Sequence, residues 1–475
     1  MIKSVYIALF CFLLLSLNHL FAQESVKEKL DFDTFIEVVY RFHPIAQQAR
    51  LNPEMGESTV RAARGGFDPR LFTNIGEKYF ENDQYYSLID AGFKIPTWFG
   101  LELYGGIEQN NGVNLNPERK THNAGLAYAG VSLSVGQGLF IDQRRADLRK
   151  AQLFEKMSHQ EQRVVLNDVL LGASNAYWDW FAAYQVVEVF EEALRLANER
   201  FEGVKSSALQ GESPIIDTVE AHIQVENREI SLQEARLNFQ NKTAALSVFL
   251  WGENSVPLEV EENVIPEDKI VLSELIKDEE INQMVDSLVN NHPVMLQQQL
   301  YLDQLEIERR WRAEQLKPVV NLKYNALNEP IGNNVVAGYS INNFTWGLGF
   351  YMPVFLRRER GQLQLTKLKI RDASLGLENL RENLFAEVNI ALNDWRTTTN
   401  QVGKSESVMQ NSEVLLKGEQ RKFEIGESSL FMVNAREVGF IESQIAFARF
   451  LASNRKALIR LNYQLGVLSD RMVEE

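Results

Sequence analysis

Two acidic residues three positions apart are the first candidates for chemistry in this sequence. Asp217 and Glu220 follow Pro214, which marks the start of an expected helix. At this spacing two carboxylates lie on the same side of a helix and could act together in a functional site. The simpler interpretation is that acidic residues in a first helical turn stabilise the helix through capping and its dipole. The sequence leaves both interpretations open.

Other residue types that often do chemistry lack the spacing that their chemistry requires. The six histidines follow no metal-ligand pattern. The segment Gly136-Gln137-Gly138 lacks the third glycine of a dinucleotide-binding loop, and no Gly-x-Ser-x-Gly nucleophile elbow occurs. We therefore expect neither enzymatic activity nor a metal or cofactor.

The charge balance argues against nucleic acid as a partner. Among 475 residues, Lys and Arg number 49 against 64 Asp and Glu, which gives a formal net charge of −15. A surface that binds nucleic acid needs an excess of basic residues to neutralise phosphates. We expect no such surface.

The first 22 residues have the features of a secretory signal peptide. Lys3 precedes an almost unbroken apolar run from Val5 to Leu17, and Ala22 provides a small residue before a cleavage site. A membrane anchor is the alternative, but the run is shorter than the roughly 20 residues that a spanning helix needs. The only cysteine, Cys11, lies in this run, so the exported chain is expected to have no thiol.

Matched residues recur in the same order and indicate two copies of one unit. The matches are His43-Pro44 with His292-Pro293, Pro69 with Pro318, Phe140 with Phe355, Asp179-Trp180 with Asp394-Trp395, and Gly211-Glu212-Ser213 with Gly426-Glu427-Ser428. The offset falls from 249 to 215 after Pro318, so the first copy carries 34 additional residues between Pro69 and Phe140. We predict a signal peptide (1–22), a first repeat (23–252), an acidic linker (253–280) and a second repeat (281–475).

Each copy contains strands with one apolar and one small or polar face. In the second copy the apolar face is predicted to hold Leu322, Tyr324, Phe344, Trp346, Leu348 and Phe350. The additional residues of the first copy supply two more strand-like runs, 85–94 and 98–107. Such strands fit a transmembrane barrel with these side chains facing lipid, or an ordinary sheet packed on a core. The first copy allows two long strands or four short ones.

Very long helices follow the strands in both copies. From 143 to 209 there is no proline, and apolar residues recur every three or four positions from Leu166 to Ala208. A helix of this length would extend about 100 Å. Trp180 and Trp395 lie on these apolar seams, which makes them packing residues. Each long helix ends at a Gly-Glu-Ser motif, and a return helix follows, at 214–251 and 430–465.

This combination of a duplicated unit, strand pairs, very long helices and Gly-Glu-Ser turns resembles the TolC-like outer-membrane efflux proteins. The resemblance covers essentially all of the mature chain. It implies an α+β membrane protein and a homotrimer, in which a transmembrane antiparallel β-barrel continues into a long α-helical coiled-coil barrel. The barrel would lie in outer-membrane lipid and the helices would extend into the periplasm. Three chains would form twelve strands if the first copy has two strands, and more if it has four.

The resemblance also implies a function and partners. Such proteins are passive exit channels for efflux or type I secretion, and they work with an inner-membrane transporter and a periplasmic adaptor. The turn motifs would be adaptor contacts, namely Gly211, Glu212, Ser213, Gly426, Glu427 and Ser428. The linker would lie around the middle of the tunnel, or be a plain solvated connector. The alternative function is an exported periplasmic coiled-coil adaptor or structural protein without its own pore.

The periplasmic entrance of this family is narrowed by acidic residues in the turn of the second copy. Here the corresponding positions are Met432 and Asn434, whereas the acidic spacing occurs in the first copy at Asp217 and Glu220. We therefore expect a different entrance, in which Phe431 and Met432 form an apolar constriction. The basic pairs 144–145 and 357–358, at the strand-to-helix junctions, are expected to contact anionic head groups or simply to be solvated.

Overall fold

The computed structural model describes residues 28–212, 214–261, 263–267, 291–329 and 338–474. The predicted signal peptide, Ser213 and residues 268–280 of the predicted linker lie outside the described residues. The chain forms two compact units, and each takes segments from both predicted repeats. The helical unit comprises the described residues of Met1–Gln47, Leu166–Ile281 and Val388–Glu475, and the sheet unit comprises Gln48–Val165 and Asn282–Glu387.

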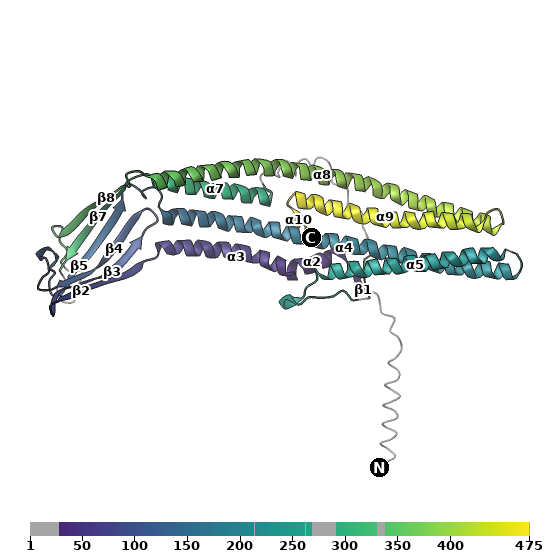
Figure 1. The fold of residues 1–475 in the computed structure, drawn as a ribbon, viewed down its shortest axis with the longest axis horizontal. Coiled ribbons are helices and arrows are strands. Elements are labelled where there is room, and N and C mark those ends of the chain that lie inside the picture. Colours follow the sequence, from purple (N-terminus) through teal and green to yellow (C-terminus); the bar gives the residue numbers. More distant parts are fainter. Residues whose placement is uncertain (1–27, 213, 262, 268–290, 330–337, 475) are drawn as a thin grey trace, which may run out of the picture. The chain divides into compact units, whose positions relative to one another are not determined.

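The helical unit is built from two antiparallel helical hairpins and short flanking elements. Its elements are β1 (Glu28–Leu30), α2 (Phe32–Phe42), α5 (Ile215–Ser247), η4 (Glu253–Ser255), β6 (Val264–Pro266), α9 (Leu430–Gln464), α10 (Leu468–Glu474) and the later parts of α4 (Gln143–Leu209) and α8 (Arg357–Glu424). Helix α5 runs back along α4, and α9 runs back along α8 (Figure 1). Strand β1 pairs in parallel with β6, which joins part of the predicted linker to the N-terminal segment.

An aromatic core holds the helical unit together. Trp180 of α4 is fully buried, stacks on Phe239 of α5 with ring centroids 6.0 Å apart, and donates from Nε1 to Thr243 Oγ1 at 2.9 Å. Phe35 of α2 packs in the same cluster. Every predicted seam residue between Leu166 and Ala208 is buried or half-buried. The prediction that Trp180 and Trp395 are packing residues is confirmed, since Trp395 is 4% exposed.

The sheet unit places six strands beside four helical segments. Its elements are α3 (Pro44–Arg64, whose first turn belongs to the helical unit), η2 (Gly65–Phe67), β2 (Arg70–Phe80), β3 (Asp83–Pro96), β4 (Leu101–Asn111), η3 (Pro117–Arg119), β5 (Leu126–Ser134), α7 (Pro293–Glu314), β7 (Val319–Asn328), β8 (Phe344–Tyr351) and the first parts of α4 and α8. Helices α3 and α7 both begin at a His-Pro pair, where the fixed φ of proline suits a first helical turn.

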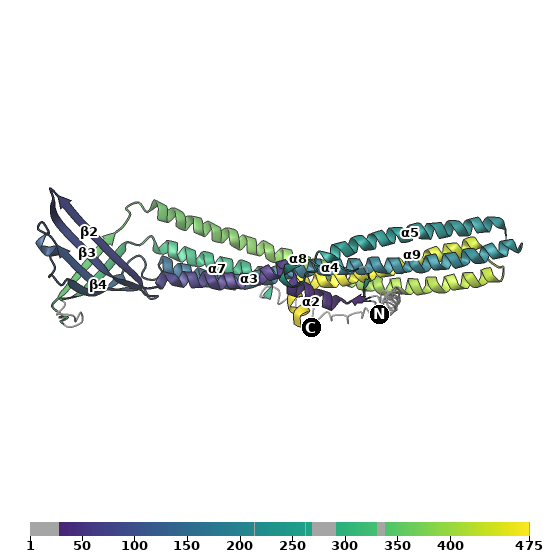
Figure 2. The same cartoon turned by 90° about the horizontal axis from the view of Figure 1, so that it is seen from below.

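The six strands form one antiparallel sheet in the order β2-β3-β4-β5-β7-β8 (Figures 1 and 2). Strands β2 to β5 form an up-and-down meander, and β5 then pairs with β7 across the two halves of the chain. The first half therefore contributes four strands and the second half two. Strands β2 and β8 form the edges of the sheet.

The sequence pattern misplaced some boundaries. The run 98–107 was expected to be a strand, but Trp98 lies in the turn before β4, where Gly100 has φ 93° and Thr97 Oγ1 donates to Leu101 O. The alternation did not indicate β2, because Phe72 lies on its polar side. The first return helix ends at Ser247 and not at 251, since Trp251 instead forms an isolated bridge with Pro257.

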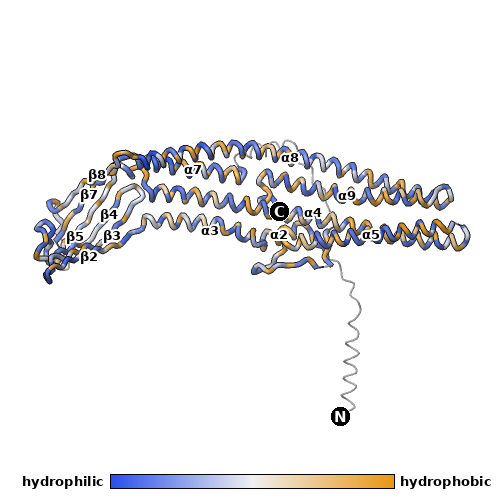
Figure 3. The backbone as a smooth tube through the Cα atoms, in the orientation of Figure 1, coloured by the Kyte–Doolittle hydropathy of each residue, from blue (hydrophilic) through white to orange (hydrophobic). Residues whose placement is uncertain are grey.

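The helices mix hydrophobic and hydrophilic residues along their length (Figure 3). Within the described ranges, no helix carries an apolar stretch long enough to cross a membrane.

Candidate functional site

One face of the sheet is apolar across all six strands. The register pairs Leu322 with Leu348 and Tyr324 with Trp346, and it continues the same face through Val131 of β5. The six residues predicted on this face, Leu322, Tyr324, Phe344, Trp346, Leu348 and Phe350, are 41–69% exposed. No core of the described residues covers them, so this face does not behave as the inside of an ordinary sheet. An apolar surface of this extent marks a site that another phase or molecule covers.

The opposite face of the sheet is polar. In strand order it carries Arg70, Asn74, Lys78, Asp90, Lys94, Glu102, Tyr104, Glu108, Tyr128, Ser132, Ser134, Asn321, Lys323, Asn325 and Thr345. Neighbouring strands are joined across this face, as where Ser134 Oγ donates to Asn321 Oδ1 at 2.7 Å. This alternation of apolar and polar faces is typical of a wall between lipid and water.

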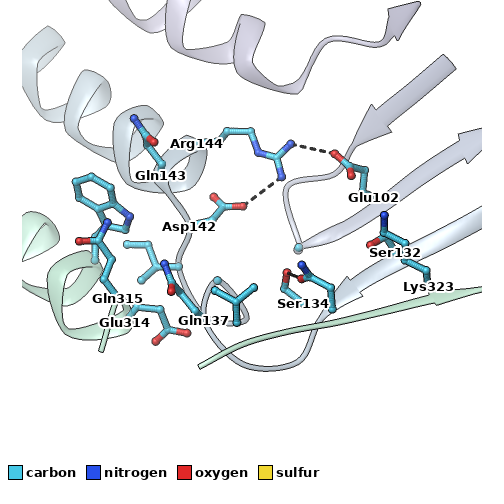
Figure 4. A pocket seen from close by; sticks show the side chains of 16 residues that line it. Glu102, Ser132, Ser134, Gln137, Asp142, Gln143, Arg144, Glu314, Gln315 and Lys323 are labelled. Atoms are coloured by element: carbon cyan, nitrogen blue, oxygen red, sulfur yellow. Dashed lines mark hydrogen bonds and ion pairs between the residues drawn. The ribbon is translucent and has the colours of Figure 1, made fainter. Parts of the chain in front are cut away.

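A pocket of about 430 Å³ lies on the polar face, where the strands meet the helices (Figure 4). Glu102 of β4 and Lys323 of β7 line it from the sheet, and Glu314 lines it from the end of α7. The guanidinium of Arg144 lies 3.5 Å from both Glu102 Oε1 and Asp142 Oδ2. These charged groups have no nucleophile among them, and they can hold water and hydrated ions.

The two arginines at this junction have different roles. Arg145 is 8% exposed, its guanidinium donates to the carbonyls of Gly138 and Leu139, and its backbone N–H donates to Asp142 Oδ1 at 2.8 Å. The expectation that the 144–145 pair contacts head groups or is solvated is therefore wrong for Arg145. A buried guanidinium needs fixed acceptors, and the loop carbonyls supply them.

The helical unit ends in two turns with the same geometry. Gly211 and Gly426 follow α4 and α8 with φ of 77° and 79°. The next residue bonds back five positions, from Glu212 N to Ser207 O at 3.0 Å and from Glu427 N to Lys422 O at 2.8 Å. This is a Schellman helix cap, which requires a residue at positive φ and thus favours glycine. The glycines of the repeated motif are explained by this cap.

The serines of the second turn also have local partners. Ser428 Oγ donates to Glu419 Oε1 at 2.6 Å, and the Ser429 side chain accepts from Met432 N at the start of α9. In contrast, Glu212 and Glu427 are exposed at the two turns, where they are open to a partner.

Two of the predicted gate residues meet between α5 and α9. The side-chain amide of Asn434 donates to Glu220 Oε1 at 3.0 Å, and Asn434 Oδ1 accepts from Arg200 Nη1 of α4 at 3.2 Å. Arg200 also forms an ion pair with Glu437 of α9. Asn434 and Glu437 are 6% and 3% exposed. We call Arg200, Glu220, Asn434 and Glu437 the interhelix polar cluster.

Arg228 of α5 lies beside this cluster. It is 8% exposed, and burial lowers the pKa of its guanidinium, whereas the nearby Glu437 acts in the opposite direction. Charged groups are costly to bury unless they are paired, so the cluster depends on its partners remaining in place.

The other predicted gate residues have different surroundings. Asp217 lies in the first turn of α5 and is half-exposed, a position where a carboxylate interacts favourably with the helix dipole. Phe431 lies in the first turn of α9, next to Met432, and is 67% exposed. An aromatic side chain this exposed at a helix start can contact a second molecule.

Comparison with known proteins finds a family model that matches part of the chain and solved structures that share its fold. Residues 46–252 match the family model described as outer membrane efflux protein. No match is found among the curated proteins.

Solved structures with this fold include several outer membrane proteins. The CmeC outer membrane channel of Campylobacter jejuni aligns with a TM-score of 0.63 and 14% identity, over 95% of this chain and 89% of that one. The outer membrane protein VceC of Vibrio cholerae aligns with a TM-score of 0.61 and 14% identity, over 91% and 95%. The MtrE outer membrane channel of Neisseria gonorrhoeae aligns with a TM-score of 0.63 and 13% identity, over 91% and 88%.

The efflux-protein resemblance predicted from the sequence is therefore confirmed. The sequence did not predict the half-buried Arg200 or the buried charges Arg228 and Glu437. A signal existed for Glu437, which lies four residues from both Val433 and Ile441 on one buried stripe of α9. A single charge on an apolar stripe indicates a partner on a neighbouring helix. Within the described residues, no three His, Cys, Asp or Glu side chains are grouped to bind a metal.

Proposed function

We propose that the protein is a trimeric outer-membrane exit channel for efflux or type I secretion, located in the outer membrane and extending into the periplasm. It is a passive pore without enzymatic activity. An inner-membrane transporter supplies the energy, and a periplasmic adaptor joins the transporter to the channel.

The observation that carries this proposal is the two-faced sheet with open edges. Its apolar face leaves Trp346 67% and Phe350 69% exposed, and its opposite face is lined with charged and polar groups. Strands β2 and β8 leave their outer backbone groups without a neighbouring strand of the same sheet. In lipid such groups must be paired, so closure requires further copies of the chain. Three copies that join β8 to β2 give a closed barrel, with lipid outside and water inside.

The helical turns are assigned two roles within the proposed channel. The turn motifs 211–213 and 426–428 contact the adaptor, and the exposed carboxylates of Glu212 and Glu427 are the groups available for that contact. Asp217, Glu220, Phe431, Met432 and Asn434 form the entrance. Glu220 and Asn434 hold α5 to α9 there, and Phe431 and Met432 narrow the opening.

Membrane fractionation followed by an unheated gel tests the proposal. We expect the protein in the outer-membrane fraction, migrating as a trimer that boiling converts to monomer. A soluble periplasmic monomer would refute the channel and would favour the coiled-coil adaptor. The matched control is boiled protein from the same fraction, which must migrate as monomer if the slow band is an assembly.

A further inference from the structure

The first half of the chain contributes two more strands than the second, and these strands form one inserted hairpin, β3–β4. Leu71 of β2 pairs with Phe93 of β3, which in turn pairs with Gly105 of β4. Where all three strands pair, each β4 residue therefore lies across β3 from the β2 residue 34 positions earlier in the sequence. The first copy is 34 residues longer than the second between the same landmarks. Because 34 is even, the insertion keeps every side chain of the sheet on its own face.

The hairpin is bonded into the sheet by a residue outside it. Tyr128 of β5 lies across Gly106 of β4, and its hydroxyl donates to Asp90 Oδ1 of β3 at 2.7 Å. A Cβ at Gly106 would stand 2.7 Å from that hydroxyl, so only glycine leaves room for the ring. One side chain of β5 thus spans β4 and fixes β3. A hairpin that lay outside the sheet would not make this contact. The contact therefore supports β3 and β4 as integral strands of the sheet.

The hairpin also changes the charge of the polar face. Within the other four strands, the polar face carries three charged residues, the basic Arg70, Lys78 and Lys323. The hairpin adds to that face three carboxylates and one lysine, namely Asp90, Glu102, Glu108 and Lys94.

Two of the added carboxylates are directly opposed across the hairpin. Asp90 pairs with Glu108 in the register, and both line a pocket of about 330 Å³ together with Arg119. All carboxylates on the polar face of the six described strands thus come from the inserted hairpin.

Resting on the trimeric channel proposed above, we propose that the β3–β4 hairpin is a pore-widening insertion that also shifts the ion selectivity of the lumen towards cations. Three copies of six strands close a barrel of eighteen, whereas three copies without the hairpin would close one of twelve. Barrel diameter grows roughly in proportion to strand number, so the insertion widens the pore by about half. Carboxylates on a pore wall attract cations and repel anions.

Electron cryo-microscopy of the detergent-solubilised native protein tests the width. We expect trimers with eighteen strands, in which β3 and β4 are part of the wall. Trimers with twelve wall strands and the hairpin outside would overturn the inference while leaving the channel intact. Absence of any trimeric barrel would instead refute the proposed function.

A deletion of residues 83–116 removes the hairpin. Because 34 residues are deleted, β2 can take the place of β4 with its apolar and polar side chains on the same faces. We expect this variant to form heat-sensitive trimers with twelve strands. If the variant fails to assemble, the strand count of the native protein alone decides the question of width.

Ion selectivity of the native channel and of Glu108→Gln tests the charge. We expect the ratio of cation to anion permeability, measured from reversal potentials in a salt gradient, to fall roughly twofold in the variant. The matched control is Glu77→Gln, which removes the same charge from the apolar side of β2 and should leave the ratio unchanged. An unchanged ratio in Glu108→Gln, or an equal fall in both variants, would overturn the assignment of selectivity to the hairpin.

Discussion

The strands of the sheet unit and the packed helices of the helical unit distribute apolar and charged side chains in opposite ways. In the sheet unit, apolar side chains are exposed, as Trp346 is at 67%, and the opposite face is charged. In the helical unit, Trp180 is fully buried, and charged residues such as Glu437 are also buried. An exposed apolar face is stable only when something covers it, whereas buried charges are stable only while their partners stay in place. The sheet unit is thus suited to a fixed wall in lipid, and the helical unit to contacts that can be broken.

The largest expected effect separates the two tryptophans. Trp180→Ala should lower the free energy of unfolding by about 3–5 kcal/mol, because it removes a fully buried ring from the core. Trp346→Ala should change it by under about 1 kcal/mol in detergent, since that ring is exposed in the sheet unit. Chemical denaturation of both variants, followed by circular dichroism, measures the difference. Equal losses of unfolding free energy in the two variants would contradict this difference between the units.

The interhelix polar cluster provides the next test. Arg200→Ala should lower the free energy of unfolding by about 3 kcal/mol, because it leaves Glu437 buried without its ion-pair partner. The double variant Arg200→Met with Glu437→Met should regain most of that loss, since it removes both charges. A double variant as unstable as Arg200→Ala would contradict this account, and thermal denaturation of both variants decides between them.

The two histidines before the helix-starting prolines give a pH-dependent comparison. Burial, with a smaller contribution from the nearby Arg163 cation, lowers the pKa of His292 to about 4. In the unfolded chain this imidazole takes up a proton at about pH 6.5. The free energy of unfolding therefore has its full value from this group above that pH, and it falls as the pH drops towards 4. The expected loss from this group is about 2 kcal/mol between pH 7 and pH 5.

The variant that tests this is His292→Asn, which retains a side chain able to cap α7 but does not titrate. The difference in melting temperature between native protein and variant should shrink or reverse as the pH falls from 7 to 5. His43→Asn is the comparison in the helical unit, where burial lowers the pKa of His43. A difference that is constant with pH for His292→Asn would rule out the titration.

The smallest expected effect concerns the turn at α5. Asp217→Ala should raise single-channel conductance in planar bilayers by less than about twofold if this carboxylate narrows the entrance. Glu226→Ala, an exposed residue further along α5, is the control and should leave conductance unchanged. Unchanged conductance in Asp217→Ala would leave only the capping role in the first turn of α5.

Patterns of strict periodicity allowed most of the fold to be predicted. The seam from Leu166 to Ala208 predicted α4, and the alternation from Phe344 predicted β8 with the residues of its apolar face. Strand β2 was not indicated, because Phe72 on one face and Thr73 on the other blur the alternation. The Gly-Glu-Ser motif was recognised as a repeated turn, but its helix cap requires φ values that a sequence does not contain.

The partners within the candidate gate were beyond prediction for a different reason. Glu220 and Asn434 lie 214 positions apart, and their hydrogen bond depends on how α5 and α9 pack. The link from Tyr128 to Asp90 likewise depends on the pairing of three strands, which periodicity does not specify. Long-range polar contacts therefore needed the structure.

Electrical recording from the purified, unheated protein in a planar lipid bilayer tests the central claim most directly. A channel made of this sheet should insert and produce stepwise, ion-conducting events, and boiled monomer from the same preparation should produce none. Purified trimer that never conducts in repeated insertions would contradict the account.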